Sequence, residues 1–95
     1  MLLRNLQIQK IEFTKQFRKQ IAKLSAKKRE KVYRTIDVFA NDSNTKSLRL
    51  HALKGELAGL YSISAGGDLR LHFEFIVIGD IARFVAVGTH AQLYQ

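Results

Sequence analysis

The stretch LYSISAGGDLRLHFEFIVIGDIARFVAVG, residues 60–88, decides the fold class of this chain. Three of its segments, 60–64, 69–78 and 81–88, are rich in β-branched and aromatic residues, which pack well on a pleated surface. Short connections of turn-forming residues separate these segments. Connections this short join antiparallel neighbours, so we predict a three-stranded antiparallel meander.

The central segment alternates between two kinds of side chain. One face carries Leu69, Leu71, Phe73 and Phe75, and the other carries Arg70, His72 and Glu74. Alternation with period two predicts a strand with one buried and one polar face. After this strand, Gly79-Asp80 predicts a two-residue hairpin turn of type II′.

Upstream of the meander, the pattern predicts one strand and two helices. Residues 6–13 alternate with a slip in phase at Gln9-Lys10, which indicates either a bulge or a strand end. Thr14 and Ser25 are each suited to cap a following helix. The apolar stripes are Phe17, Ile21 and Leu24 in the first helix and Val32, Ile36 and Phe39 in the second.

Together these elements predict an α+β fold in a single domain spanning 1–95. An N-terminal strand and a two-helix hairpin precede the antiparallel meander. We expect the helices to pack on one face of a four-stranded twisted sheet, because each element must bury its apolar side against another.

The charge distribution points to a polyanionic partner. Residues 1–34 hold eleven Lys and Arg residues and two acidic residues, a net charge of +9. Residues 35–95 hold five Lys and Arg residues and six acidic residues, a net charge of −1. Lys15, Lys19 and Lys23 form a row opposite the apolar stripe of the first helix, and we expect this row to contact RNA phosphates. A solvated surface is the alternative interpretation.

The absence of cysteine and the lack of a long apolar segment bear on the cellular compartment and on which metal sites the chain can form. The chain has no cysteine, which excludes disulfides and thiolate metal sites and suits a reducing cytoplasm. No apolar segment approaches the roughly 20 residues that a membrane-spanning helix needs, and the N-terminus does not read as a secretory signal. We therefore expect a cytoplasmic protein with no membrane partner.

Three local motifs, in order, resemble one known family. Residues 50–59 (LHALKGELAG) are similar to the H-x-L-x-G-x-x-x-G segment of YafQ-like toxins, and residues 87–94 (VGTHAQLY) to their terminal G-T-H-x-x-L-[FY]. Between them, residues 67–73 (GDLRLHF) look like the turn and following arginine of the wider RelE/ParE toxin superfamily. The resemblance covers nearly the whole chain.

The resemblance implies the toxin of a type II toxin–antitoxin system. The implied activity is ribosome-dependent cleavage of mRNA by attack of the RNA 2′-hydroxyl, and the implied partners are the ribosome, mRNA and a cognate antitoxin. One departure is that Ser64 stands where the YafQ branch usually has a histidine. A non-enzymatic, ParE-like inhibitor of DNA gyrase is therefore an alternative, and a sequence-specific DNA-binding module is a weaker one.

Metal-independent RNA cleavage needs a general base, a cation that stabilises the phosphorane and a general acid. Histidine suits both proton-transfer roles. We assign one to His90 and the second to His51, for which substrate positioning is the alternative. Arg70 is the candidate phosphate ligand, because a guanidinium binds phosphate oxygens in pairs; the alternative is a surface ion pair with Glu74. Asp68 could orient a histidine or act as base, and Tyr94 could stack on a base of the RNA.

The third histidine, His72, is not assigned to catalysis, and the spacing of all three histidines bears on metal binding. His72 lies within a strand, where a structural role is expected. The three histidines lack the close spacing of a zinc site on a helix. We expect no metal and no cofactor.

Overall fold

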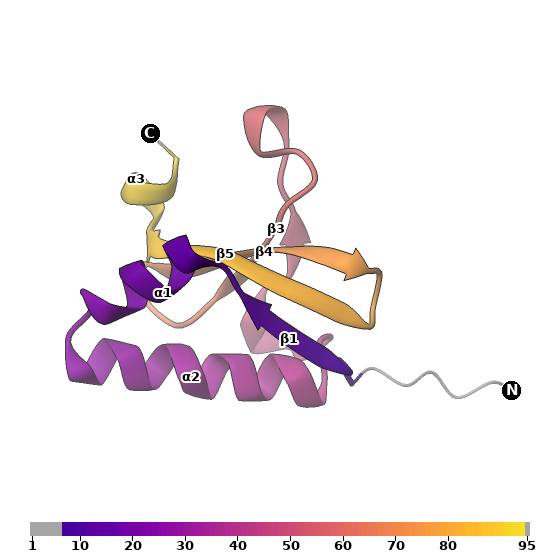
Figure 1. Ribbon diagram of the computed structural model, residues 1–95, viewed down its shortest axis with the longest axis horizontal. Helices are drawn as coiled ribbons and strands as arrows, with labels where there is room; N and C mark the ends of the chain where they lie inside the picture. The colour runs from indigo at the N-terminus through magenta and orange to yellow at the C-terminus, as the bar shows by residue number, and fades with distance from the viewer. Residues whose placement is uncertain (1–6, 95) are drawn as a thin grey trace, which may run out of the picture.

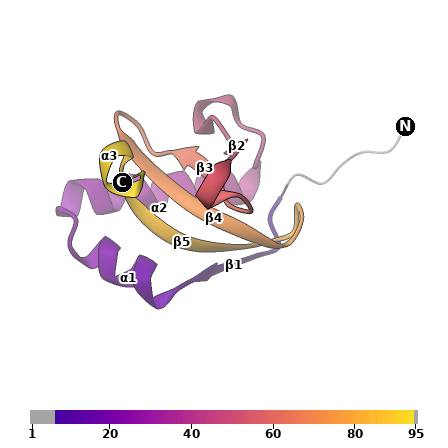
Figure 2. The same ribbon diagram turned by 90° about the horizontal axis from the view of Figure 1, so that it is seen from above.

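A mixed five-stranded sheet organises the computed structural model, which describes residues 7–94 (Figures 1 and 2). The strand order is β1-β5-β4-β3-β2. β1 is parallel to β5, and the other pairs are antiparallel. The strands are β1 (Lys10–Phe13), β2 (His51–Ala52), β3 (Tyr61–Ser64), β4 (Leu69–Val77) and β5 (Ile81–Thr89).

The four predicted strands and their α+β arrangement are confirmed, and β2 is an addition to them. Its two residues extend the sheet beyond β3, with His51 opposite Ser62 and Ala52 opposite Tyr61. A strand this short, lying between the 3-10 helices η1 (Lys46–Leu48) and η2 (Gly55–Leu57), has no periodicity that could be recognised in the sequence.

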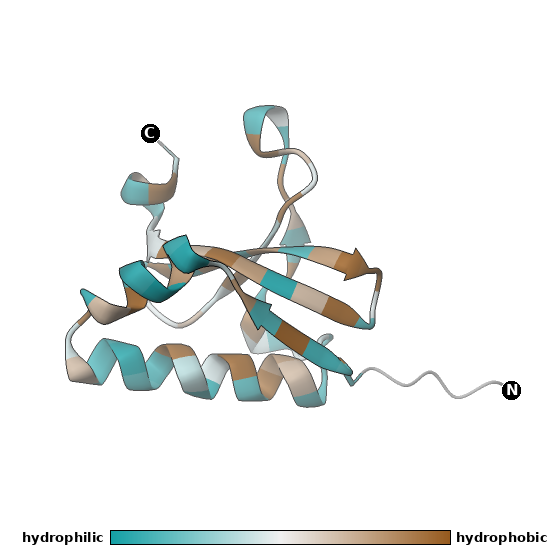
Figure 3. Ribbon diagram, viewed as in Figure 1, coloured by the Kyte–Doolittle hydropathy of each residue, from teal (hydrophilic) through white to brown (hydrophobic). Residues whose placement is uncertain are grey.

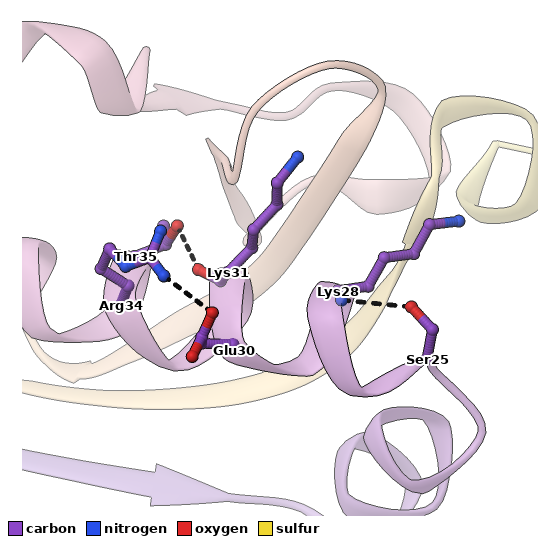
Figure 4. A network of polar contacts seen from close by, with 6 residues as sticks. All are labelled: Ser25, Lys28, Glu30, Lys31, Arg34 and Thr35. Atoms are coloured by element: carbon purple, nitrogen blue, oxygen red, sulfur yellow. Dashed lines mark hydrogen bonds and ion pairs between the residues drawn. The ribbon is translucent and has the colours of Figure 1, made fainter.

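Two helices cover one face of the sheet, and both begin at the predicted caps. Thr14 Oγ1 accepts from the N–H of Phe17 at the start of α1 (Lys15–Ala22). Ser25 Oγ accepts from the N–H of Lys28 at the start of α2 (Ala26–Asn41), as Figure 4 shows. Each cap satisfies an N–H group that has no partner within the helix.

The core lies between these helices and the sheet. Phe39 of α2 packs against Phe73 of β4, with ring centroids 4.8 Å apart, and against Phe84 of β5 at 5.7 Å. Phe17 of α1 lies 5.6 Å from Phe84. All four rings are fully buried, and each contributes roughly 1.5–3 kcal/mol by leaving water. The apolar bands of α2 alternate with polar bands, as expected for a helix with one buried stripe (Figure 3).

The structure corrects the predicted boundaries at two places. Leu6 lies outside the described residues, and β1 begins at Lys10, within the phase slip. The N–H groups of Gln9 and Lys10 both donate to the same acceptor there, Asp80 O. The hairpin between β4 and β5 has a three-residue connection rather than two. Its turn is closed by the Asp80 N–H on Val77 O, with Gly79 at φ +77°, a value that favours glycine.

Helix α1 closes the exposed edge of β5 where β1 ends. Gln16 Nε2 donates to Val85 O at 3.1 Å, and the N–H of Val87 donates to Gln20 Oε1 at 2.9 Å. Val85 is the extra residue of a bulge, because Phe84 and Ala86 pair with the consecutive residues Phe73 and His72. Side-chain amides thus take the place of a neighbouring strand beyond Phe13.

The opposite face of the sheet is left open by α1 and α2. Helix α3 (His90–Leu93) and the loop that contains η2 rise on this face (Figures 1 and 2). Within residues 7–94, no helix combines the length and apolar character that crossing a membrane requires.

Candidate functional site

Cross-strand pairing brings polar side chains together on the open face of the sheet. His51, Ser62 and His72 pair in sequence across β2, β3 and β4. Ser64 and Arg70 form the adjacent pair across β3 and β4. Directly opposed residues of neighbouring antiparallel strands point to the same side, so these five side chains share one face.

The C-terminal helix adds two more polar residues to this face. Thr89 Oγ1 accepts from the Gln92 N–H, and Gln92 Oε1 accepts from the Thr89 N–H at 2.8 Å, which forms a capping box for α3. Gly88 makes room for this arrangement, because a Cβ there would lie 2.8 Å from Gln92 Oε1. The chain therefore turns sharply after β5 and directs His90 and Tyr94 back over the sheet.

Tyr94 stacks over the histidines. Its ring centroid lies 4.3 Å from that of His90 and 5.3 Å from that of His72, which it meets edge-on. The Tyr94 N–H also donates to His90 O at 3.1 Å. These contacts position the tyrosine ring at the wall of a hollow.

The hollow has a volume of about 380 Å³ and no acidic residue in its lining. This volume lies near the lower end of the range for small-ligand sites. Two arginines and two histidines among its lining residues make it suited to an anion. The lining residues are Arg49, His51, Ser62, Ser64, Arg70, His90 and Tyr94.

Two buried polar atoms of this region have no hydrogen-bond partner among the described residues. Ser62 is fully buried and His72 is 2% exposed, and neither Ser62 Oγ nor His72 Nε2 is satisfied. Burial lowers the pKa of His72 first, and the charges of His51 and His90 lower it further. His72 is therefore favoured as a neutral ring packed beneath Tyr94.

The hydrogen bond of His51 determines its tautomer. His51 Nδ1 lies 2.8 Å from Arg49 O. A carbonyl oxygen can only accept, so Nδ1 carries the hydrogen. In the neutral ring, Nε2 then carries the lone pair, which is the form that a general base requires.

Arg70 is anchored by its own turn. Its Nη1 donates to Gly67 O at 2.9 Å, to Leu69 O at 3.1 Å and to Ser64 Oγ at 3.2 Å. Within the described part of the chain, no carboxylate lies within ion-pair distance of it. Glu74, the partner considered from the sequence, instead pairs with Arg83 at 3.5 Å.

The structure brings together four of the predicted site residues and separates the others from them. His51, Arg70, His90 and Tyr94 line the hollow. Asp68 does not; it is exposed in the turn before β4 and lines a smaller hollow with Lys28 and Lys31. These two lysines extend from the same side of α2 (Figure 4).

The lysine row predicted for RNA contact lies on α1. Lys15, Lys19 and Lys23 are exposed and, together with the two glutamines that bind β5, line a wide hollow of about 450 Å³. This hollow is distinct from the one with the histidines, because the two have no lining residue in common.

Ser64, noted from the sequence only as a departure from the YafQ pattern, lines the hollow, and two further lining residues were missed. Ser62 could have been found, because period-two alternation places it on the same face of β3 as Ser64 and pairing brings it opposite His72. Arg49 carried no such signal, because it follows a 3-10 helix in an irregular segment. Within residues 7–94, no group of three or more His, Cys, Asp or Glu residues is arranged to bind a metal ion.

Solved structures share this arrangement of strands and helices. YafQ from E. coli strain BL21(DE3) superposes with a TM-score of 0.74 at 22% sequence identity, covering 92% of this chain and 99% of YafQ. The chain has the RelE-like fold.

Two further structures with the RelE-like fold extend the comparison. The RelBE2 toxin–antitoxin complex from Mycobacterium tuberculosis includes a chain that superposes with a TM-score of 0.73 at 20% identity, covering 90% of this chain and 94% of that one. A YoeB/ParE toxin from Agrobacterium tumefaciens superposes with a TM-score of 0.69 at 18% sequence identity. The match covers 85% of this chain and 98% of that toxin. No family model and no curated protein sequence matches the chain, so the likeness is one of structure.

Proposed function

We propose that this protein is the toxin of a toxin–antitoxin system and cleaves mRNA on the ribosome in the hollow of the open sheet face. The observation that carries the proposal is the convergence of His51, Arg70, His90 and Tyr94 on one anion-compatible hollow. Structures with the same fold are described as toxins, and several are solved as toxin–antitoxin complexes.

In the proposed reaction, each lining residue has one role. His51 Nε2 takes the proton of the RNA 2′-hydroxyl, whose oxygen attacks the adjacent phosphorus. The guanidinium of Arg70 stabilises the additional negative charge on the phosphorane. His90 gives a proton to the departing 5′-oxygen, which leaves a 2′,3′-cyclic phosphate, while Tyr94 stacks on a neighbouring base.

Ser64 supports this role of Arg70. The YafQ branch usually has a histidine at this position, and here the hydroxyl accepts from Arg70 Nη1. We therefore propose that Ser64 orients the phosphate-binding arginine and that His51 and His90 carry the proton transfers without a third histidine.

The proposed partners follow from charge and from the related complexes. A toxin of this kind must be kept inactive, and we propose a cognate antitoxin whose binding segment is acidic and amphipathic. Such a segment would neutralise the basic N-terminal part of the chain and fold on binding. We propose the cytoplasm as the compartment, because ribosomes and mRNA meet there.

The experiment that tests the proposal maps mRNA ends after induction of the toxin in cells. We expect new 5′ ends at codon-phased positions, and loss of these ends in the His51→Gln and His90→Gln variants. Removing a general acid or base lowers a rate by about 10²–10⁴-fold. Intact mRNA with inhibited DNA supercoiling would instead identify a gyrase inhibitor.

A further inference from the structure

Arg49 is the only non-glycine residue within residues 7–94 with a positive φ, +52°. It ends the 3-10 helix η1, where its N–H donates to Lys46 O at 3.1 Å. Gly or Asn usually occupies a left-handed position at a helix end, because the Cβ of other residues crowds the following carbonyl. Nothing in the turn itself requires arginine.

The side chain of Arg49 lines the hollow, and its backbone carbonyl binds a histidine that lines the same hollow. Its side chain is exposed and lines the hollow, and no carboxylate in the described part of the chain pairs with it. Its carbonyl accepts the hydrogen of His51 Nδ1. A strained backbone that persists close to a candidate base indicates a functional constraint rather than a turn preference.

We propose that Arg49 binds the RNA phosphate that flanks the cleaved one and that its carbonyl positions His51. Arg70 projects from β4 and Arg49 precedes β2, so the two arginines lie on either side of β3. Each guanidinium can bind one phosphate through paired hydrogen bonds, so two arginines on opposite sides of β3 can bind two phosphates of one strand. This inference rests on the proposed function, because it assumes an RNA strand in the hollow.

The Arg49→Gly variant separates the two roles. Glycine accepts the left-handed conformation and keeps the carbonyl on His51, so the Tm should equal or exceed that of the parent chain. The flanking phosphate is bound equally before and during the reaction, so we expect KM to rise about 10–100-fold with kcat within about threefold. Arg49→Lys keeps the charge and loses the paired contact, and should be intermediate.

Lys46→Gln is the matched control. It removes one positive charge from the same short segment at an exposed position that does not line the hollow. We expect its KM to stay within about twofold of the parent, and the slope of log affinity against log salt to fall by about 0.7 for Arg49→Gly only. If Arg49→Gly and Lys46→Gln changed KM and the salt slope equally, Arg49 would contribute only through the net charge of the chain. That result would overturn the proposal.

A non-cleavable probe separates this proposal from the proposed function. We would titrate a short 2′-O-methyl oligonucleotide and follow the ring resonances of His51 and His90. Binding by the parent chain that weakens about tenfold or more in Arg49→Gly, with His51 still protonated at Nδ1, supports Arg49 even if no mRNA cleavage is detected.

Three further results would overturn the proposal. The first is a parent chain whose histidine resonances do not respond to the probe, and the second is an Arg49→Gly variant that binds it equally well. The third is a clear loss of Tm in both Arg49→Gly and Arg49→Asn, two residues that tolerate the conformation, because this would assign Arg49 a structural role.

Discussion

Arg70 lines the hollow and is also held by hydrogen bonds to its own turn. Its side chain is half-buried and donates to two carbonyls of its own turn as well as to Ser64. An arginine restrained in this way loses little entropy when it binds phosphate.

Arg70→Ala should therefore lower both activity and stability. We expect cleavage to fall about 10²–10³-fold, as for removal of one donor to a developing oxyanion, and the free energy of unfolding to fall by about 1–2 kcal/mol through the lost hydrogen bonds. Single-turnover cleavage and urea denaturation measure the two effects. Full activity in a well-folded variant would remove Arg70 from the site.

Arg83→Ala is the matched control for this substitution. Arg83 lies on β5, where it pairs with Glu12 at 3.0 Å and with Glu74 at 3.5 Å, and it does not line the hollow. Arg83 and both glutamates are only partly exposed, and ion pairs near the surface contribute about 0–1 kcal/mol. Arg83→Ala should leave cleavage unchanged.

His72 should make stability depend on pH. Its pKa is lowered in the folded state by burial and by the charges of His51 and His90. The unfolded chain therefore binds more protons, and stability is fully present above the ordinary histidine pKa, near 6.5, and is lost as the pH falls below it. The slope for one proton is at most about 1.4 kcal/mol per pH unit.

His72→Gln should flatten this dependence between pH 7.5 and pH 5. Urea denaturation at several pH values compares the parent chain with the variant, and the free energy of unfolding of the parent should fall more steeply. Parallel curves for the two proteins would mean that His72 titrates alike in the folded and unfolded states.

Individual residues differ in how far they were predictable. His51, Arg70, His90 and Tyr94 line one hollow, and local motifs had pointed to each of them. The burial of His72 depends on α3 folding back so that Tyr94 covers it, a tertiary contact that no local pattern records. The position of Arg49 depends on a left-handed backbone that favours other residue types.

Among the elements, α1 has a structural role that its amphipathic pattern did not reveal. The stripe of Phe17 and Ile21 explains how the helix packs, and both residues are buried. The glutamines that bind β5 read only as polar positions in the sequence. Strand-edge groups need partners, and whether a side chain supplies them depends on the distance between elements that are far apart in the chain.

Gln20→Ala should destabilise the fold more than Gln16→Ala. Gln20 accepts from the partly buried N–H of Val87, and an unsatisfied buried group costs about 1–3 kcal/mol. Gln16 is exposed, so water can replace its bond to Val85 O. Gln20→Glu keeps an acceptor oxygen and should retain most of the stability. Equal unfolding free energies for Gln20→Ala and Gln20→Glu would contradict this role.

The short elements mark where prediction of the fold reached its limit. Periodicity over several residues identified β3, β4, β5 and both long helices. The two-residue β2 and the four-residue α3 contain less than one full repeat of any pattern. The prediction ended the last strand at residue 88 with no helix after it, whereas β5 ends at Thr89 and His90 begins α3.

Basic side chains gather on two separate surfaces of the molecule, one on α1 and one at the hollow of the open sheet face. The lysine row of α1 and the anion-compatible hollow share no lining residue, so we propose that α1 docks on ribosomal RNA while the hollow receives the mRNA. Phosphate contacts of the first kind add affinity without sequence preference.

Replacing Lys15, Lys19 and Lys23 with Gln should weaken ribosome binding evenly across mRNAs. If all three contact phosphate, the slope of log affinity against log salt should fall by roughly 0.7–0.9 per lost contact. Sedimentation with ribosomes at several salt concentrations measures this slope. A control that replaces Lys10, Lys46 and Lys54, which lie on other elements, should change the slope less. An unchanged slope in the α1 variant would mark the row as a solvated surface.

The parallel pairing of β1 with β5 also orders the events of biosynthesis. Phe13 pairs with Phe84, so β1 cannot complete its pairing with β5 until 71 further residues have been synthesised. Domains fold as units, and this sheet has no complete core before β5 emerges. The strand that completes the core also leads directly into His90 and Tyr94. The hollow therefore cannot form on the nascent chain until both β5 and α3 have been synthesised.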